Sequence, residues 1–162
     1  MKSIFPILVF SSVLLLGMNC STSKKTALIT PRDITYTTIK SGNMFGAGEE
    51  GLAAGIIAAS NTVEMNFLIN KMNGVNEEIK ESLISDVHFF DEYMLVFIFD
   101  KLRGSGGHSL DVKNILNTGN NIIVTAHEIA PNGPASTVMT QPYVVLKVKK
   151  SSLPLLLNIT EL

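Results

Sequence analysis

The segments after Tyr93 constrain the fold most, because all are of strand length and no helix-length stretch separates them. The first, 93–99 (YMLVFIF), is continuously apolar, which is typical of a central strand covered on both faces. Strands joined by short connections pair antiparallel with their neighbours, so we expect an antiparallel meander. The further strand candidates are 108–116, 121–129, 143–149 and 154–159.

The first half of the chain adds strand and helix patterns. Segment 33–40 is rich in β-branched residues and alternates, and a short strand is expected near 55–60. In 61–74, Asn61 and Glu64 have capping-box spacing before an amphipathic helix that Gly74 can end. A second helix is expected from Asn76 to Leu83. The predicted fold class is α+β: one or two short helices, then an antiparallel meander in a small barrel- or sandwich-like sheet.

The N-terminus has the features of an export signal. An apolar run from Ile4 to Leu16 is too short to span a bilayer but suits a signal peptide. Cys20, the only cysteine, follows it, and we expect this residue to be lipidated as in bacterial lipoproteins. Gly17 and Asn19 make an imperfect lipoprotein motif, so an ordinary secreted protein is the alternative.

The expected organisation is therefore a signal peptide at 1–19, a polar tether at 20–32 and one domain at 33–162. Cleavage before Cys20 would leave 143 of the 162 residues, enough for a single core. The expected location is the cell envelope, with an outer-membrane anchor facing the periplasm. The net charge of −1 and the lack of a long basic block give no sign of nucleic-acid binding.

The stretch 46–51 (GAGEEG) has the glycine spacing of a dinucleotide-binding loop. That loop must lead into a helix whose N-terminus faces phosphate, whereas the following residues contain Gly55 and β-branched residues. Glu49 and Glu50 would also repel phosphate. We interpret the glycines as a loop and expect no cofactor.

Enzyme chemistry finds little support in the sequence. Ser109 lies beside His108 in a strand pattern, which puts the two side chains on opposite faces. The acidic and histidine residues that could bind a metal lack the close ligand spacing of a zinc site. These candidates are His88, Asp91, Glu92, His127 and Glu128. We therefore expect neither catalysis nor a metal.

Two loops are the candidate binding surface, because a meander would bring 103–108 and 131–143 to the same end of the sheet. Glycines permit close approach, and Pro142 would stiffen the longer loop. Arg103, His108 and Gln141 would donate hydrogen bonds, and Tyr143 would be an aromatic anchor. The alternative is a hairpin turn and an ordinary surface loop. The candidate residues are Arg103, Gly104, Ser105, Gly106, Gly107, His108, Pro131, Asn132, Gly133, Gln141, Pro142 and Tyr143.

A second binding route is strand addition to an exposed sheet edge, for which 154–159 is the candidate.

Five motifs occur along the chain in this order: FGAGEEG, NFLINKMN, FIFD, RGSGGHSL and ASTVMTQPYVVLKVKKSSLPL. Their order resembles that of the PrcB-like family, which is named for a protease-stability complex. The resemblance covers roughly 39–157, and its most specific parts are Gly106–Gly107–His108 and the run from Thr140 to Ser151. The order around Phe89, Phe90 and Asp91 departs from the family's Asp-Phe pair.

The resemblance implies a non-enzymatic, often lipid-anchored domain outside the cytoplasm that binds and stabilises a partner protease. The expected partner is thus a secreted or envelope protease, or another envelope protein. An inhibitor of the chagasin type is a second hypothesis, and an enzyme or small-ligand binder is the third. Oligomeric state does not follow from the sequence.

Overall fold

The computed structural model describes residues 30–74 and 88–161. The predicted signal peptide, Cys20 and the predicted helix from Asn76 to Leu83 lie outside the described residues. Among the helices of the described part, none is both long and apolar enough to cross a bilayer.

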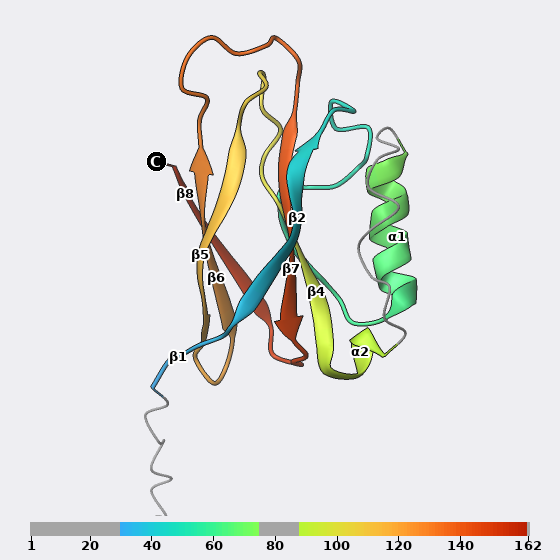
Figure 1. Ribbon diagram of the computed structural model, residues 1–162, viewed down its shortest axis with the longest axis vertical. Helices are drawn as coiled ribbons and strands as arrows, with labels where there is room; N and C mark the ends of the chain where they lie inside the picture. The colour runs from blue at the N-terminus through green and yellow to red at the C-terminus, as the bar shows by residue number, and fades with distance from the viewer. Residues whose placement is uncertain (1–29, 75–87, 162) are drawn as a thin grey trace, which may run out of the picture.

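Two four-stranded sheets pack face to face, and a helix covers the far side of one of them (Figure 1). We call β1-β5-β6-β8 the outer sheet and β2-β7-β4-β3 the middle sheet. The outer sheet consists of β1 (Arg32–Asp33), β5 (Ser109–Asn117), β6 (Ile122–Ile129) and β8 (Leu155–Glu161). The middle sheet consists of β2 (Tyr36–Met44), β7 (Gln141–Lys149), β4 (Tyr93–Phe99) and β3 (Gly55–Ala59). The helices are α1 (Thr62–Asn73) and α2 (Phe89–Glu92).

The predicted α+β class is confirmed, with two sheets that do not close into a barrel. The expected pairing of successive strands is wrong in part. The consecutive pairs β3–β4 and β5–β6 are antiparallel neighbours, but the chain changes sheet after β1, β4, β6 and β7. β8 returns to the outer sheet and pairs parallel with β6.

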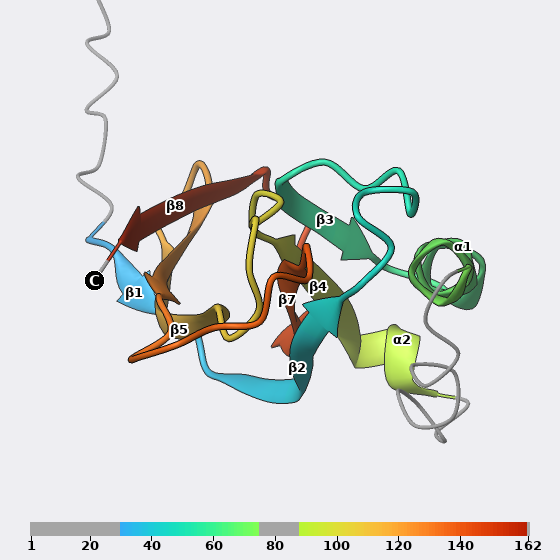
Figure 2. The ribbon, with the colours of Figure 1, turned by 90° about the horizontal axis from the view of Figure 1, so that it is seen from above.

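The layering of the molecule explains these crossings. Side chains alternate along β4, so Met94, Val96 and Ile98 face the outer sheet. Phe97 and Phe99 lie on the opposite face and pack in the core beneath α1. A strand that is apolar on both faces needs cover on both, and Figure 2 shows the three resulting layers.

Helix α1 begins as its sequence predicts. The Asn61 side chain accepts a hydrogen bond from the Glu64 N–H at 2.9 Å. Glu64 in turn accepts from the N–H of Ser60, one residue earlier than in a regular capping box, at 2.8 Å. This bond is the main reason why the pKa of Glu64 lies below its usual range. The apolar face of α1 packs on the middle sheet through Leu68 and Met72, among others.

Candidate functional site

Three connections lie at one end of the sandwich, which we call the loop end. They are 45–54 after β2, 100–108 after β4 and 130–140 after β6, at the top of Figure 1. The chain enters the fold at the opposite end, through β1, which pairs with the far end of β5. The two loops expected to share one end therefore do so, although by crossing between sheets.

The loops 100–108 and 130–140 are joined to each other by hydrogen bonds. Arg103 and Thr140 exchange backbone N–H···O bonds of 2.7 and 3.0 Å. Gly106 donates its N–H to the carbonyl of Ser136 at 3.0 Å. The Thr140 hydroxyl donates to the carbonyl of Ser105 at 2.8 Å. The two loops thus form one surface.

Beneath that surface lies a charge cluster, which we define as Asp100, Arg103, His108 and Glu128. The guanidinium of Arg103 contacts Asp100 at 2.6 and 2.7 Å and lies 3.6 Å from Glu128. The side chains of Asp100 and Glu128 are only 5% and 4% exposed. Buried carboxylates require a paired charge, and Arg103 supplies it between the two sheets.

The imidazole of His108 lies between an acid and a hydroxyl. Its Nδ1 is 2.6 Å from Glu128 Oε1, and its Nε2 is 3.1 Å from Ser105 Oγ. Asn43 of β2 donates its side-chain amide to the His108 carbonyl at 3.0 Å. Acid, imidazole and hydroxyl therefore form a continuous chain of side-chain hydrogen bonds that the sequence analysis did not predict.

A signal for Glu128 was present in the sequence. Ile122, Val124 and Ala126 face the core between the sheets, and the period of two places Glu128 on the same buried face. An acid at an inward position needs a buried partner. The partners come from the distant 100–108 loop, which no local pattern indicates.

The predicted roles of three site residues require correction. Gln141, Pro142 and Tyr143 belong to β7 and are buried, because this strand begins two residues earlier than expected. Tyr143 is 3% exposed and packs in the core beneath α1, so it is no surface anchor in this structure. Gln141 donates to the carbonyls of Leu52 and Asp100, at 3.0 and 2.9 Å.

The other predicted residues divide between interior and surface. Arg103 and His108 are largely engaged in the charge cluster, and Gly106 is buried against Ser136. Ser105 and Pro131 are half-buried. The exposed members are Gly104, Gly107, Asn132 and Gly133.

Apolar side chains at the loop end were not predicted. Four large ones are between 38% and 57% exposed there: Phe45, Leu102, Val138 and Met139. Leu102 lies next to the 45–54 loop, because a Cβ at Gly48 would be 3.7 Å from its side chain. The sequence did contain a signal for this exposed surface, because apolar residues occur within a loop that is rich in glycine and proline.

The glycine spacing at 46–51 forms a loop that is closed on itself. The carboxylate of Glu50 is buried and accepts the N–H of Gly46 at 2.8 Å, where a phosphate oxygen would have to bind. The following element is the strand β3. Both features agree with the interpretation of these glycines as a loop.

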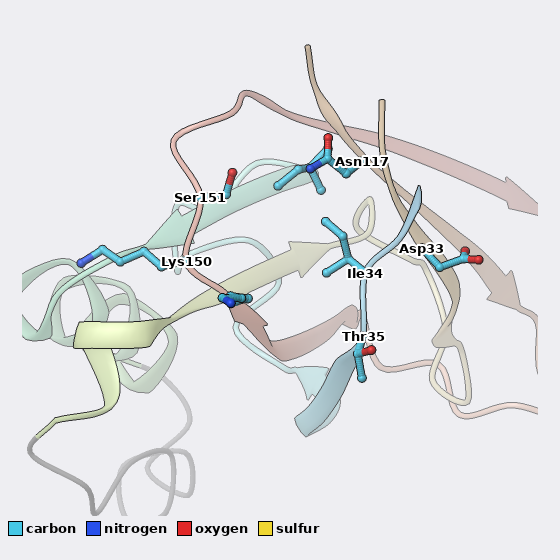
Figure 3. A pocket seen from close by; sticks show the side chains of 8 residues that line it. Asp33, Ile34, Thr35, Asn117, Lys150 and Ser151 are labelled. Carbon is cyan, nitrogen blue, oxygen red and sulfur yellow. The ribbon is translucent and has the colours of Figure 1, made fainter. Parts of the chain in front are cut away.

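A pocket of about 350 Å³ lies at the end opposite the loop end, beside the entry of the chain (Figure 3). Its Lys150 extends away from Ile34 and Asp33 and donates to the carbonyl of Phe90 at 2.8 Å. No group of three or more metal-ligating side chains occurs within 30–74 and 88–161.

Comparison with known proteins gives one family. Residues 94–149 match the model of the family described as PrcB C-terminal. No curated protein matches the chain. No solved structure matches it either. The segment from β4 to β7, which carries the charge cluster and both joined loops, is therefore a match to the PrcB C-terminal family, as the sequence motifs predicted.

Proposed function

We propose that the loop end is a docking surface with which the protein binds and stabilises a secreted or envelope protease. The observation that carries this proposal is the presence of four exposed apolar side chains on the connections of the loop end, Phe45, Leu102, Val138 and Met139. Aromatic residues and methionine are enriched at protein interfaces, and exposed apolar groups gathered at one site favour association. The family match supports a protease-associated role, and this role requires no catalysis.

The construction of the surface supports tight binding. The bonds between Arg103 and Thr140 and between Gly106 and Ser136 hold the two loops together in the free protein. A surface that is already ordered loses less conformational entropy when a partner binds. The exposed run 132–139 can then contact a partner without first having to fold.

We further propose that Cys20 carries a lipid that anchors the protein in the cell envelope. An outer-membrane anchor facing the periplasm is favoured, and free secretion is the alternative. The chain enters the sandwich at β1, at the end opposite the loops. An anchor attached there would leave the apolar loop end directed away from the membrane and accessible to a protein partner.

Two variants of this function deserve separate tests. The exposed run 132–139 suits insertion into a protease cleft, which would inhibit the protease instead of stabilising it. β8 is an edge strand of the outer sheet, so a partner could also add a strand beside it. Leu156 reports on the β8 edge because 47% of it is exposed.

Site-specific photo-crosslinking in the native envelope tests the docking surface. A photoreactive residue at Val138 should form a covalent product with a protease, identified by mass spectrometry. The matched control is Val63, an exposed apolar residue in the first turn of α1, which should give no such product. A product from Leu156 alone would assign binding to β8, and no product from any position would refute the proposal.

The activity of the captured protease separates stabiliser from inhibitor. Its peptidase activity should survive longer at 37 °C with the full chain present than without it. An immediate loss of activity on mixing would instead establish inhibition.

A further inference from the structure

We propose that Ser105 is a nucleophile activated by His108 and Glu128, and that this triad hydrolyses esters of small carboxylic acids. The inference goes beyond partner binding and stands or falls separately. It rests on how three side chains, from one loop and one strand, are connected at the loop end.

The order of contacts is the one that nucleophilic serine chemistry requires. Ser105 Oγ is 3.1 Å from Nε2 of His108, so the imidazole can accept the hydroxyl proton. The other ring nitrogen, Nδ1, is 2.6 Å from Glu128 Oε1, which fixes the orientation of the ring. The acid comes from β6, twenty residues away in sequence, so the arrangement is not a local turn motif.

Each carboxylate oxygen of Glu128 has a partner. Its second oxygen, Oε2, lies 3.6 Å from the guanidinium of Arg103, which is itself bonded to Asp100. A buried carboxylate in this position stabilises the imidazolium that forms when His108 takes the proton. Arg103 would act as a positioning residue for Glu128.

Ser105 is fixed by bonds on either side of it. Its carbonyl accepts the hydroxyl of Thr140, and the next residue, Gly106, donates to Ser136. Arg103, two residues before Ser105, pairs with Thr140. A nucleophile placed within a bonded loop needs little rearrangement before it reacts.

Gly104 directly precedes Ser105 in the chain. This glycine is exposed, and a Cβ built on it would meet no atom within 4 Å. Ser105 itself is half-buried. A half-buried hydroxyl beside an exposed glycine suits a small acyl group better than a polymer that would need an extended cleft.

The reaction balances with water as the only co-reactant. Ser105 Oγ attacks the ester carbonyl and passes its proton to Nε2 of His108, and the carbonyl electron pair moves to oxygen. Collapse of this intermediate breaks the bond to the alcohol, which leaves with the proton from Nε2. Water then attacks the acyl-serine in the same way, releasing the carboxylic acid and restoring Ser105.

A fluorophosphonate probe and p-nitrophenyl acetate test the triad on the full chain in mild detergent. With the probe, Ser105 Oγ forms a bond to phosphorus, fluoride leaves, and the hydroxyl proton passes to His108. Labelling should map to Ser105 by peptide mass spectrometry and vanish in Ser105→Ala. Ser109→Ala removes an exposed neighbouring serine and should label like the native chain.

His108→Gln should lower the rates of labelling and ester hydrolysis by about 10²-fold or more, because the general base is lost. Glu128→Gln tests the acid while leaving a side chain of similar size, and it should reduce both rates. Circular dichroism establishes that each variant is folded. Labelling that is absent from the folded native chain, or unchanged in Ser105→Ala, would refute the triad and leave the contacts as a structural latch.

Discussion

At the scale of single residues, Arg103 determines the character of the loop end. Its position in a glycine-rich loop predicts a hydrogen-bond donor on the binding surface. The structure instead places it between Asp100 and Glu128, within the charge cluster. The loop was predictable from its glycines, whereas the inward direction of Arg103 depends on acids contributed by two other positions in the fold.

Arg103→Met should lower the free energy of unfolding by about 3–5 kcal/mol, because it leaves Asp100 and Glu128 buried without their cation. Lys101→Met is the matched control, since Lys101 pairs with Glu161 at an exposed position and should change stability by less than about 1 kcal/mol. Urea unfolding followed by circular dichroism measures both. Equal losses in the two variants would contradict the assigned role of Arg103.

Gly107 is required for its backbone conformation. Its φ is +85°, and a Cβ there would lie 2.8 Å from Cβ of Pro131. Gly107→Ala should therefore destabilise the protein by about 1–3 kcal/mol. Gly104→Ala, in open space in the same loop, should stay within about 0.5 kcal/mol of the native chain. Thermal unfolding midpoints compare the two, and a larger effect at Gly104 would refute this reading of the loop.

At the scale of elements, periodicity located the strands well. The predicted segments 93–99, 108–116 and 121–129 correspond within a residue to β4, β5 and β6. The capping pattern at Asn61 and Glu64 likewise found the start of α1. These features depend on neighbours along the chain. α2, a four-residue turn before β4, has too few residues for any periodic signal.

Glu64→Gln should lower the urea midpoint at neutral pH. The N–H of Ser60 holds the pKa of Glu64 below its usual range, so its charged form stabilises the fold at pH values above the range in which it titrates. That contribution is lost as pH falls through the lowered pKa, because the carboxyl then becomes neutral like the glutamine. The difference between native and variant midpoints should therefore shrink from pH 7 to pH 3.

Glu49→Gln serves as the control for this substitution, because Glu49 is an exposed loop residue that takes no part in the cap of α1. Its substitution removes one carboxylate charge, as Glu64→Gln does, but should not lower the urea midpoint at pH 7. A Glu64→Gln difference that grows toward acid would have the wrong sign and would contradict the proposed capping contribution.

At the scale of the whole molecule, the division of strands between two sheets could not be read from the sequence. Val112 and Val124 in the outer sheet and Val96 and Leu146 in the middle sheet all contribute to the same core. Their alternation is equally compatible with a continuous meander. What separates the sheets is that β4 is apolar on both faces and needs a layer on each, which is a property of the assembled fold.

Hydrogen exchange should report this layered arrangement. Backbone amides in β4 and β7, the inner strands of the middle sheet, should exchange most slowly and at the rate set by global unfolding. Amides of β8, at an edge of the outer sheet, should exchange faster. Exchange measured by NMR at several urea concentrations tests this order, and slower exchange in β8 than in β4 would contradict it.

Because the chain enters the sandwich at the end opposite the loops, the length of the sandwich would set the distance between a lipid anchor and the loop end. The nine residues of β7 span about 30 Å from the loop end to the entry end. If Cys20 is lipidated, the sandwich acts as a spacer of that length. The contact surface would then stand clear of the lipid headgroups, so its height would select partners that project at least as far from the same membrane.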